Sequence, residues 1–239
     1  MGKSQKLARR ELIEKMQRDQ ARADKRRTAL IVTAAIVVGL AIIAFPAVKL
    51  IQQSIQKNQT IADIGASASA ASCSPVSDTS ASGTQDHVQE GTKVQYSTSP
   101  PSSGKHYPVP SEFGKTFYDK TDRPAVENLV HNLEHGYTIL WYNDTAAADS
   151  KQMDEIEKIA KGKLPAEANG KFIAAPFHAS DGKAWPDGKN IAFAHWGGGG
   201  GDQAKQQGHL QYCGSVSGQA LTDFIKKYPA ADSPEPNGA

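Results

Sequence analysis

The segment His131-Asn132-Leu133-Glu134-His135 carries the side chains in this sequence that are best suited to chemistry. On a helix the two histidines are four residues apart on one face, where both imidazoles can reach one metal ion. In one class of zinc peptidases, the glutamate of an HxxEH pattern acts as general base toward a metal-bound water. The segment therefore suggests either a metal site or a metal-dependent hydrolase with Glu134 as its base.

Three features argue against the hydrolase. Gly136 ends the helix directly after the second histidine, whereas a peptidase site needs a longer supporting helix. The domain is small for a protease with a substrate cleft, and no downstream glutamate stands in a recognisable ligand motif. We therefore assign no catalytic residue. A non-catalytic site for a transition metal, zinc or copper, is more plausible than the hydrolase.

Two further histidines are candidates to complete such a site. His106 stands in a loop rich in proline and glycine, and His195 stands in a short apolar segment. The alternative is a hydrogen-bonded network of histidine and glutamate without metal, in which His106 fixes its loop and His195 packs on a strand. The remaining histidines are interpreted as surface residues, and these are His87, His178 and His209.

The helix that must carry the HxxEH segment follows Asp122, a good N-cap, and Pro124, which suits a first turn. Its apolar stripe consists of Val126, Leu129, Val130 and Leu133. At about 100° per residue, His131 and His135 point to nearly the opposite side from that stripe. We therefore expect either that another part of the chain covers them or that they are exposed.

The surrounding elements predict an α+β fold with a small mixed sheet and packed helices. The apolar run at 137–142 is typical of a central strand, and Pro176 places the end of the next strand at a sheet edge. The first two strands can pair in parallel through a right-handed crossover, and the third antiparallel. The predicted strands are 137–142, 171–177 and 191–196, with one further short strand at 92–96 in an otherwise irregular stretch. The predicted helices after the first are 145–161 and one capped by Ser217.

Residues 28–48 contain no charged side chain and are long enough to cross a bilayer as one helix. The first 27 residues carry ten basic and four acidic side chains, which leaves 17 basic and 21 acidic on the rest of the 239-residue chain. The positive-inside rule then places residues 1–27 in the cytoplasm as a basic arm and the remainder outside. Because the basic excess is confined to that arm, a basic globular face for nucleic acid is excluded.

Residues 49–84 are expected to form a polar stalk and a flexible linker rich in serine and alanine, ahead of a globular domain at 85–230 and a disordered tail at 231–239. The chain has two cysteines, Cys73 in the linker and Cys213 near the end of the domain. In an oxidising compartment this even count favours one disulfide between them. Two unrelated thiols or bridges between chains remain the alternatives.

Several short motifs give the chain a family resemblance. They are Cys-Ser-Pro at 73–75, PPSSGKHY at 100–107, VHNLEHGY at 130–137, AHW at 194–196 and YCG at 212–214. In these motifs the chain resembles a bacterial family of membrane-anchored exported proteins that is known as a domain of unknown function. The resemblance covers about residues 73–236. It implies an exoplasmic domain in which the paired cysteines fit, and it implies no reaction.

Together these features predict a single-pass protein of the bacterial cell membrane whose C-terminal domain binds something without catalysis. The candidate metal ligands are His106, His131, His135 and His195, with Glu134 beside them as an outer ligand or base. A larger membrane complex, such as a respiratory one, is the expected macromolecular partner besides the bilayer around residues 28–48. An accessory subunit or assembly factor of this kind gains effective concentration from its anchor.

Overall fold

The computed structural model describes residues 3–58, 60–81 and 84–238, and the chain divides into two units, 1–58 and 59–239. The first unit contains one helix, α1 (Lys3–Asn58). Within the described residues, the stretch Leu12–Pro46 of α1 is long and apolar enough to cross a membrane. Because α1 continues without interruption to Asn58, the expected stalk at 49–58 is part of the same helix.

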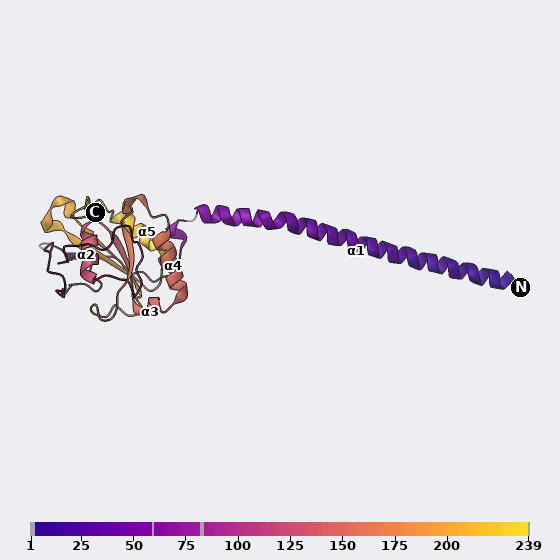
Figure 1. The fold of residues 1–239 in the computed structure, drawn as a ribbon, viewed down its shortest axis with the longest axis horizontal. Helices are drawn as coiled ribbons and strands as arrows, with labels where there is room; N and C mark the ends of the chain where they lie inside the picture. The colour runs from indigo at the N-terminus through magenta and orange to yellow at the C-terminus, as the bar shows by residue number, and fades with distance from the viewer. Residues whose placement is uncertain (1–2, 59, 82–83, 239) are drawn as a thin grey trace. The chain divides into compact units, whose positions relative to one another are not determined.

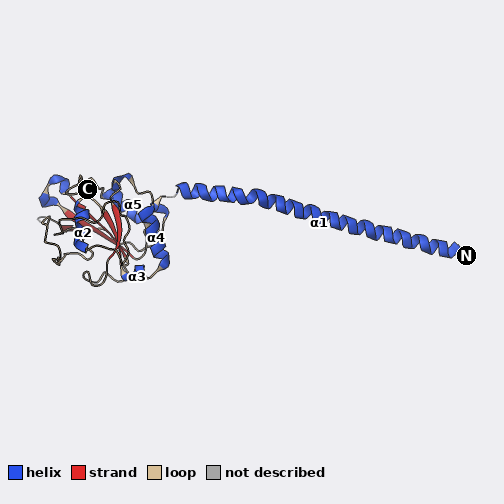
Figure 2. Ribbon diagram, in the orientation of Figure 1, coloured by secondary structure: helices blue, strands red, loops and turns tan. Residues whose placement is uncertain are grey.

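The second unit is built on a five-stranded sheet, whose strands are drawn red in Figure 2. Along the sheet the order is β1 (Ser77–Ser80), β5 (Gln207–Cys213), β4 (Ile191–Gly197), β2 (Thr138–Tyr142) and β3 (Phe172–Pro176). β2 and β3 are parallel, and every other neighbouring pair is antiparallel. The predicted strands at 137–142, 171–177 and 191–196 and their mixed pairing are therefore confirmed, with β3 at the edge, where its proline is tolerated. The short strand expected at 92–96 was wrong, since that described segment is irregular.

Helices cover both faces of this sheet, as Figure 1 shows. α2 (Val126–Glu134) packs on one face, against Trp141, Ala194 and Trp196. The other face is covered by α3 (Asp144–Ala147), α4 (Ser150–Lys161) and α5 (Gly218–Lys227). Four short 3-10 helices complete the unit: η1 (Ile61–Asp63), η2 (Ala166–Ala168), η3 (Gly199–Gly201) and η4 (Gln203–Lys205). The α+β prediction is confirmed.

Two predicted helix boundaries were wrong, and side-chain hydrogen bonds explain the difference in each case. α2 begins after Ala125 rather than at Pro124, because the carboxylate of Asp122 accepts hydrogen bonds from Asp119 N and Lys115 Nζ instead of capping the helix. The single helix expected at 145–161 is split into α3 and α4, since Asn143 caps the first and Asp149 caps the second.

Gly136 ends α2, as the sequence predicted. Its φ of +91° lies in the left-handed region that favours glycine. A Cβ atom at this position would lie only 2.4 Å from the carbonyl oxygen of Ala230. The close approach of that later segment therefore requires a glycine directly after the HxxEH residues.

The flexible linker expected at 65–84 is instead largely part of the globular unit. β1 pairs with β5, Ala66 N donates to Val216 O, and Ala71 and Ala81 are buried. Small side chains bury little apolar area, which suggested a tether, but they also let the backbone approach β5 closely enough to pair with it. Residues 82 and 83 of the expected linker lie outside the described residues.

The predicted disulfide between Cys73 and Cys213 is present, with an S–S distance of 2.01 Å. It joins the segment just before β1 to the last residue of β5 and closes a loop with a sequence separation of 140. Cys213 is fully buried, and Cys73 packs at the edge of the same core. The bridge thus fixes the former linker on the α4/α5 side of the sheet.

The tail expected to be disordered folds back over the C-terminal end of α2. Glu235 N donates to Glu134 O at 3.0 Å, and Ser233 is buried. Lys171 Nζ donates to the carbonyl oxygens of His135, Pro236 and Gly238 at 2.7, 2.9 and 2.9 Å. One ammonium therefore fixes the backbone of the tail, which composition alone did not indicate. Residue 239 lies outside the described residues.

Candidate metal centre

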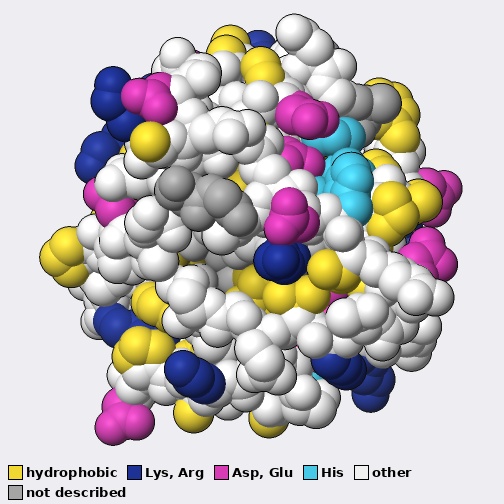
Figure 3. Space-filling view, turned by 90° about the vertical axis from the view of Figure 1, so that its left-hand side faces the viewer, with side chains coloured by type: hydrophobic (Ala, Val, Ile, Leu, Met, Phe, Trp, Pro, Cys, Tyr) yellow, Lys and Arg dark blue, Asp and Glu magenta, His cyan; other side chains and the backbone are white. Residues whose placement is uncertain are grey.

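The polar face of α2 is covered by other parts of the chain, which is one of the two outcomes that the sequence left open. His131, Glu134 and His135 are only 5%, 2% and 8% exposed, although they lie opposite the apolar stripe. The segments around residues 85–88 and 104–107 cover one side, and the tail at 231–238 covers the other. Histidines (cyan) still reach the surface beside acidic side chains (magenta) in Figure 3. The group is thus mostly buried, with one edge near solvent.

Backbone carbonyls fix the protonation of two of these imidazoles. His131 Nδ1 lies 2.6 Å from Tyr107 O, and His106 Nδ1 lies 2.8 Å from Gly104 O. Because a carbonyl oxygen only accepts, both Nδ1 atoms carry the proton and donate. In the neutral rings each Nε2 then presents a lone pair. Such a bond from the second ring nitrogen is what orients a metal-ligating histidine.

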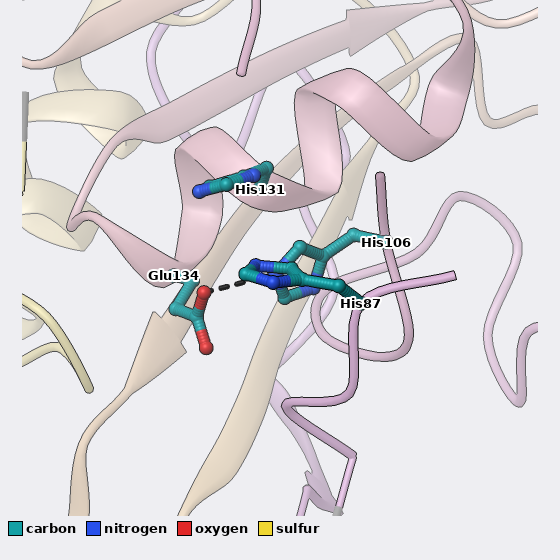
Figure 4. A group of neighbouring side chains, drawn as sticks. All are labelled: His87, His106, His131 and Glu134. Carbon is teal, nitrogen blue, oxygen red and sulfur yellow. Dashed lines mark ion pairs between the residues drawn. The ribbon is translucent and has the colours of Figure 1, made fainter. Parts of the chain in front are cut away.

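These lone pairs converge with a carboxylate and a third imidazole. One ligand atom each from His87, His106, His131 and Glu134 lies within 4.8 Å of all the others. Figure 4 shows the three imidazoles grouped beside the carboxylate. For metal–ligand bonds of about 2.0–2.1 Å, tetrahedral geometry places ligand atoms roughly 3.3–3.4 Å apart. The four ligand atoms therefore lie close to the spacing that one tetrahedral ion requires.

The contact between His106 and Glu134 is unfavourable for a neutral ring beside an ionised carboxylate. His106 Nε2 lies 2.9 Å from Glu134 Oε2, yet this nitrogen makes no well-directed hydrogen bond among the described residues. The Nε2 lone pair of the neutral ring would face the lone pairs of the carboxylate at a distance where they repel. Either a proton makes His106 a cation or a metal ion lies against both groups, and both solutions are electrostatically sound.

The charge state of the group favours metal binding. Burial lowers the pKa of His131 to about 4, which the hydrogen bond to Tyr107 O only partly opposes. Burial alone would raise the pKa of Glu134, but the neighbouring His106 ring and the Gln85 amide more than offset it, so this pKa lies below its usual value. At neutral pH His131 is therefore neutral and Glu134 is ionised. These are the forms that ligate a metal.

Sequence reasoning identified some of this group and missed one member. His106, His131 and Glu134 come together as proposed, and Glu134 lies among the candidate ligands rather than outside them. His87, interpreted as a surface residue, is exposed but contributes to the group. It is positioned by a parallel bridge to His106, in which Val88 N donates to His106 O. This long-range pairing lies in an irregular segment, so no periodic pattern in the sequence predicts that His87 lies beside His106.

His135 lies beside the group rather than within it. Its Nε2 is 3.1 Å from His131 Nε2 and 3.4 Å from Glu235 Oε2. Together with Glu134 and Glu235 it forms a second set of candidate ligand atoms, again within 4.8 Å of one another. The two sets share Glu134.

His195 does not join the His106–His131–Glu134 group, so its assignment as a ligand was wrong. Successive side chains of a strand point to opposite faces of the sheet. Trp196 faces α2 and the ring of His106, whereas His195 faces α5 and Tyr228. His195 Nε2 donates to Asp232 O at 3.1 Å, so His195 packs on the opposite face. His209 is also buried and not a surface residue, since its Nδ1 pairs with Asp78 Oδ1 at 2.8 Å.

The fully buried His195 is expected to make the fold sensitive to acid. Burial lowers the pKa of His195 to about 4, so the folded state resists the proton that the unfolded state accepts near pH 6.5. This contribution to stability is complete above about pH 6.5 and is lost as the pH falls toward 4, by about 1.4 kcal/mol per pH unit. Urea unfolding followed by tryptophan fluorescence at pH 7, 5.5 and 4.5 measures it. The profile of His195→Phe should be flatter, and an equally steep profile would contradict the assignment.

The comparison with other proteins bears on the same part of the chain. No curated protein and no solved structure matches it. The family model described as "Protein of unknown function (DUF3105)" matches residues 87–239. This range begins at the histidine that the sequence analysis missed and includes every candidate ligand of both sets. Because the match covers well over half of the chain, the protein belongs to the DUF3105 family.

Proposed function

We propose that this protein is a membrane-tethered, non-catalytic domain that binds a transition-metal ion through His87, His106, His131 and Glu134. One observation carries the proposal: the Nδ1 atoms of His106 and His131 are hydrogen-bonded to backbone carbonyls, and ligand atoms of both rings lie within 4.8 Å of the Glu134 carboxylate and of His87. Three imidazoles and one carboxylate form a ligand set that suits zinc, with copper(II) as its strongest competitor.

The location of the metal domain outside the cytoplasm belongs to the same proposal. A disulfide that persists is typical of oxidising compartments, and the basic arm ahead of the apolar stretch of α1 favours a cytoplasmic N-terminus. A small domain on one anchor suits an accessory subunit or assembly factor of a larger membrane complex. Copurification of such a complex with the detergent-solubilised full-length chain tests this part.

Two features favour binding over hydrolysis. A general base works best when its pKa lies near the operating pH, whereas the surroundings of Glu134 lower its pKa. Clefts of about 610 and 190 Å³ open elsewhere on the described surface, and no member of the four-ligand set lines either of them. A substrate held in these clefts would therefore not touch Glu134.

The substitution Glu134→Gln tests whether Glu134 acts as a metal ligand or as a general base. We expect it to lower metal affinity by about 10- to 100-fold, because the amide removes the one negative charge of the four-ligand set while its oxygen still accepts from Gln85. Equilibrium dialysis against zinc measures the change. The matched control is Glu127→Gln, which alters another buried glutamate of α2 that accepts from Val94 N outside the set. Unchanged metal affinity in Glu134→Gln would refute the role of Glu134 as a ligand.

A further inference from the structure

A second set of ligand atoms adjoins the proposed site. It consists of Glu134, His135 and Glu235, and one ligand atom from each lies within 4.8 Å of the other two. His135 Nε2 is 3.4 Å from Glu235 Oε2, close to the roughly 3.3–3.4 Å edge of a tetrahedron of metal ligands. Glu134 belongs to both sets, and a carboxylate has two oxygens with which to contact two ions. The arrangement is that of two neighbouring positions joined by one shared carboxylate.

The tail that carries Glu235 is held in place by the fold. Glu235 N donates to Glu134 O, so the two glutamates are joined through the backbone as well. Lys171 Nζ binds three carbonyl oxygens, one at the C-terminal end of α2 and two in the tail on the far side of Glu235. Gly238 lies against the ring of His135, where a Cβ atom would approach within 2.5 Å. The backbone of Glu235 is therefore held beside His135 by its own N–H and by the residues that follow it.

We propose that a second divalent cation binds to Glu134, His135 and Glu235, with the carboxylate of Glu134 bridging it to the first. This inference rests on the proposed function for its first ion. The second position has three protein ligands instead of four, and the side chain of Glu235 is 55% exposed. A site with three ligands keeps an open coordination position, so the second ion binds more weakly and exchanges with solvent.

The net charge of the two-ion centre indicates which class of molecule fills the open coordination position of the second ion. Two divalent cations bring four positive charges, and Glu134 and Glu235 return two negative ones, which leaves a net positive centre at the edge of the domain. A small oxyanion such as hydrogen phosphate balances it, whereas one hydroxide offsets half of it. An anion that bridges both ions strengthens the binding of the second. Inorganic phosphate should therefore raise the affinity for the second ion, measured by dialysis with and without it.

Stoichiometry tests the proposal on the full-length chain in detergent. Equilibrium dialysis against zinc, followed by elemental analysis, should find one tight and one weaker equivalent. Glu235→Ala should remove the weaker equivalent and leave the tight one unchanged. Lys171→Met should weaken the second at least about tenfold, since it releases the tail without touching either ion. Glu157→Ala, at a partly exposed position of α4, is the control and should retain both equivalents.

The distance between the ions distinguishes a paired site from adventitious binding. With copper(II) in both positions, electron paramagnetic resonance should show a coupled pair, because ions that share a ligand lie about 3.5–4 Å apart. Two uncoupled ions, or two equivalents that survive Glu235→Ala, would overturn the inference. A single equivalent lost in His87→Ala but not in Glu235→Ala would overturn it while leaving the proposed function standing. No bound metal at all would overturn both.

Discussion

Replacing His106 by alanine should lower the affinity of the protein for zinc by at least about 100-fold. The ring is fully buried, its Nδ1 is fixed by Gly104 O, and its Nε2 faces Glu134 at 2.9 Å. Its removal deletes one of four ligands and leaves the carboxylate without its nearest partner. The metal content of the full-length chain, purified without chelators, should fall from one tight equivalent to none that survives dialysis.

A second variant keeps this prediction testable if His106→Ala folds poorly. His87 is exposed, so His87→Ala leaves no buried cavity, yet it removes another ligand of the set. It should lower zinc affinity about 10- to 100-fold with little change in the free energy of unfolding. His178→Ala, which removes a histidine paired with Asp144 elsewhere on the surface, is the matched control. If His87→Ala and His178→Ala bind zinc equally well, the four-ligand site is wrong.

Removal of the disulfide is the second large effect that we expect. The bridge closes a loop with a sequence separation of 140, and in the chain-entropy model its loss costs about 4–5 kcal/mol. Typical domains have an unfolding free energy of about 5–15 kcal/mol, so this is a large fraction of the total. The double variant Cys73→Ala/Cys213→Ala should therefore unfold at a much lower urea concentration, as followed by tryptophan fluorescence.

The reduced wild-type protein is the control for the double variant. Both lack the crosslink, but only the variant also lacks the buried sulfur of Cys213. Equal midpoints would assign the effect to the crosslink itself. A loss below about 1 kcal/mol in both would show that β1 and the segment before it already hold to β5 in the unfolded ensemble or contribute little to the folded one.

The sequence predicted those elements whose patterns are local. The apolar stripe of α2, the glycine that ends it, the strands β2, β3 and β4 and the Ser217 cap are each visible within a short window. β1 was missed because its four residues, Ser77–Ser80, bury almost no apolar area, and β5 because it alternates with glycine and polar residues. Both strands form through long-range backbone pairing, which composition does not record.

In the candidate site, too, the sequence predicted local relations between residues but not long-range contacts. His131, Glu134 and His135 share one helix, so their spacing alone indicated that they act together. His195 was misassigned because its place on β4 depends on which side of the strand faces α2, and Trp196 takes that side. His87 and Glu235 lie in segments that are ordered by contacts rather than by their own periodicity: a bridge to His106 in one case and Lys171 in the other.

The Cys73–Cys213 bridge also divides the ligands into two groups with different covalent attachment. His87, His106, His131, Glu134 and His135 all lie inside the ring that the bridge closes, whereas Glu235 lies outside it. A protease that cuts any loop between the two cysteines therefore leaves both pieces joined, and no ligand of the first ion leaves the molecule. A cut after Cys213 sheds the peptide with Glu235 instead. A single proteolytic cut can thus separate only one ligand, Glu235, from the rest of the two adjoining sites. The tail is the only described part of these sites that is not enclosed by the disulfide.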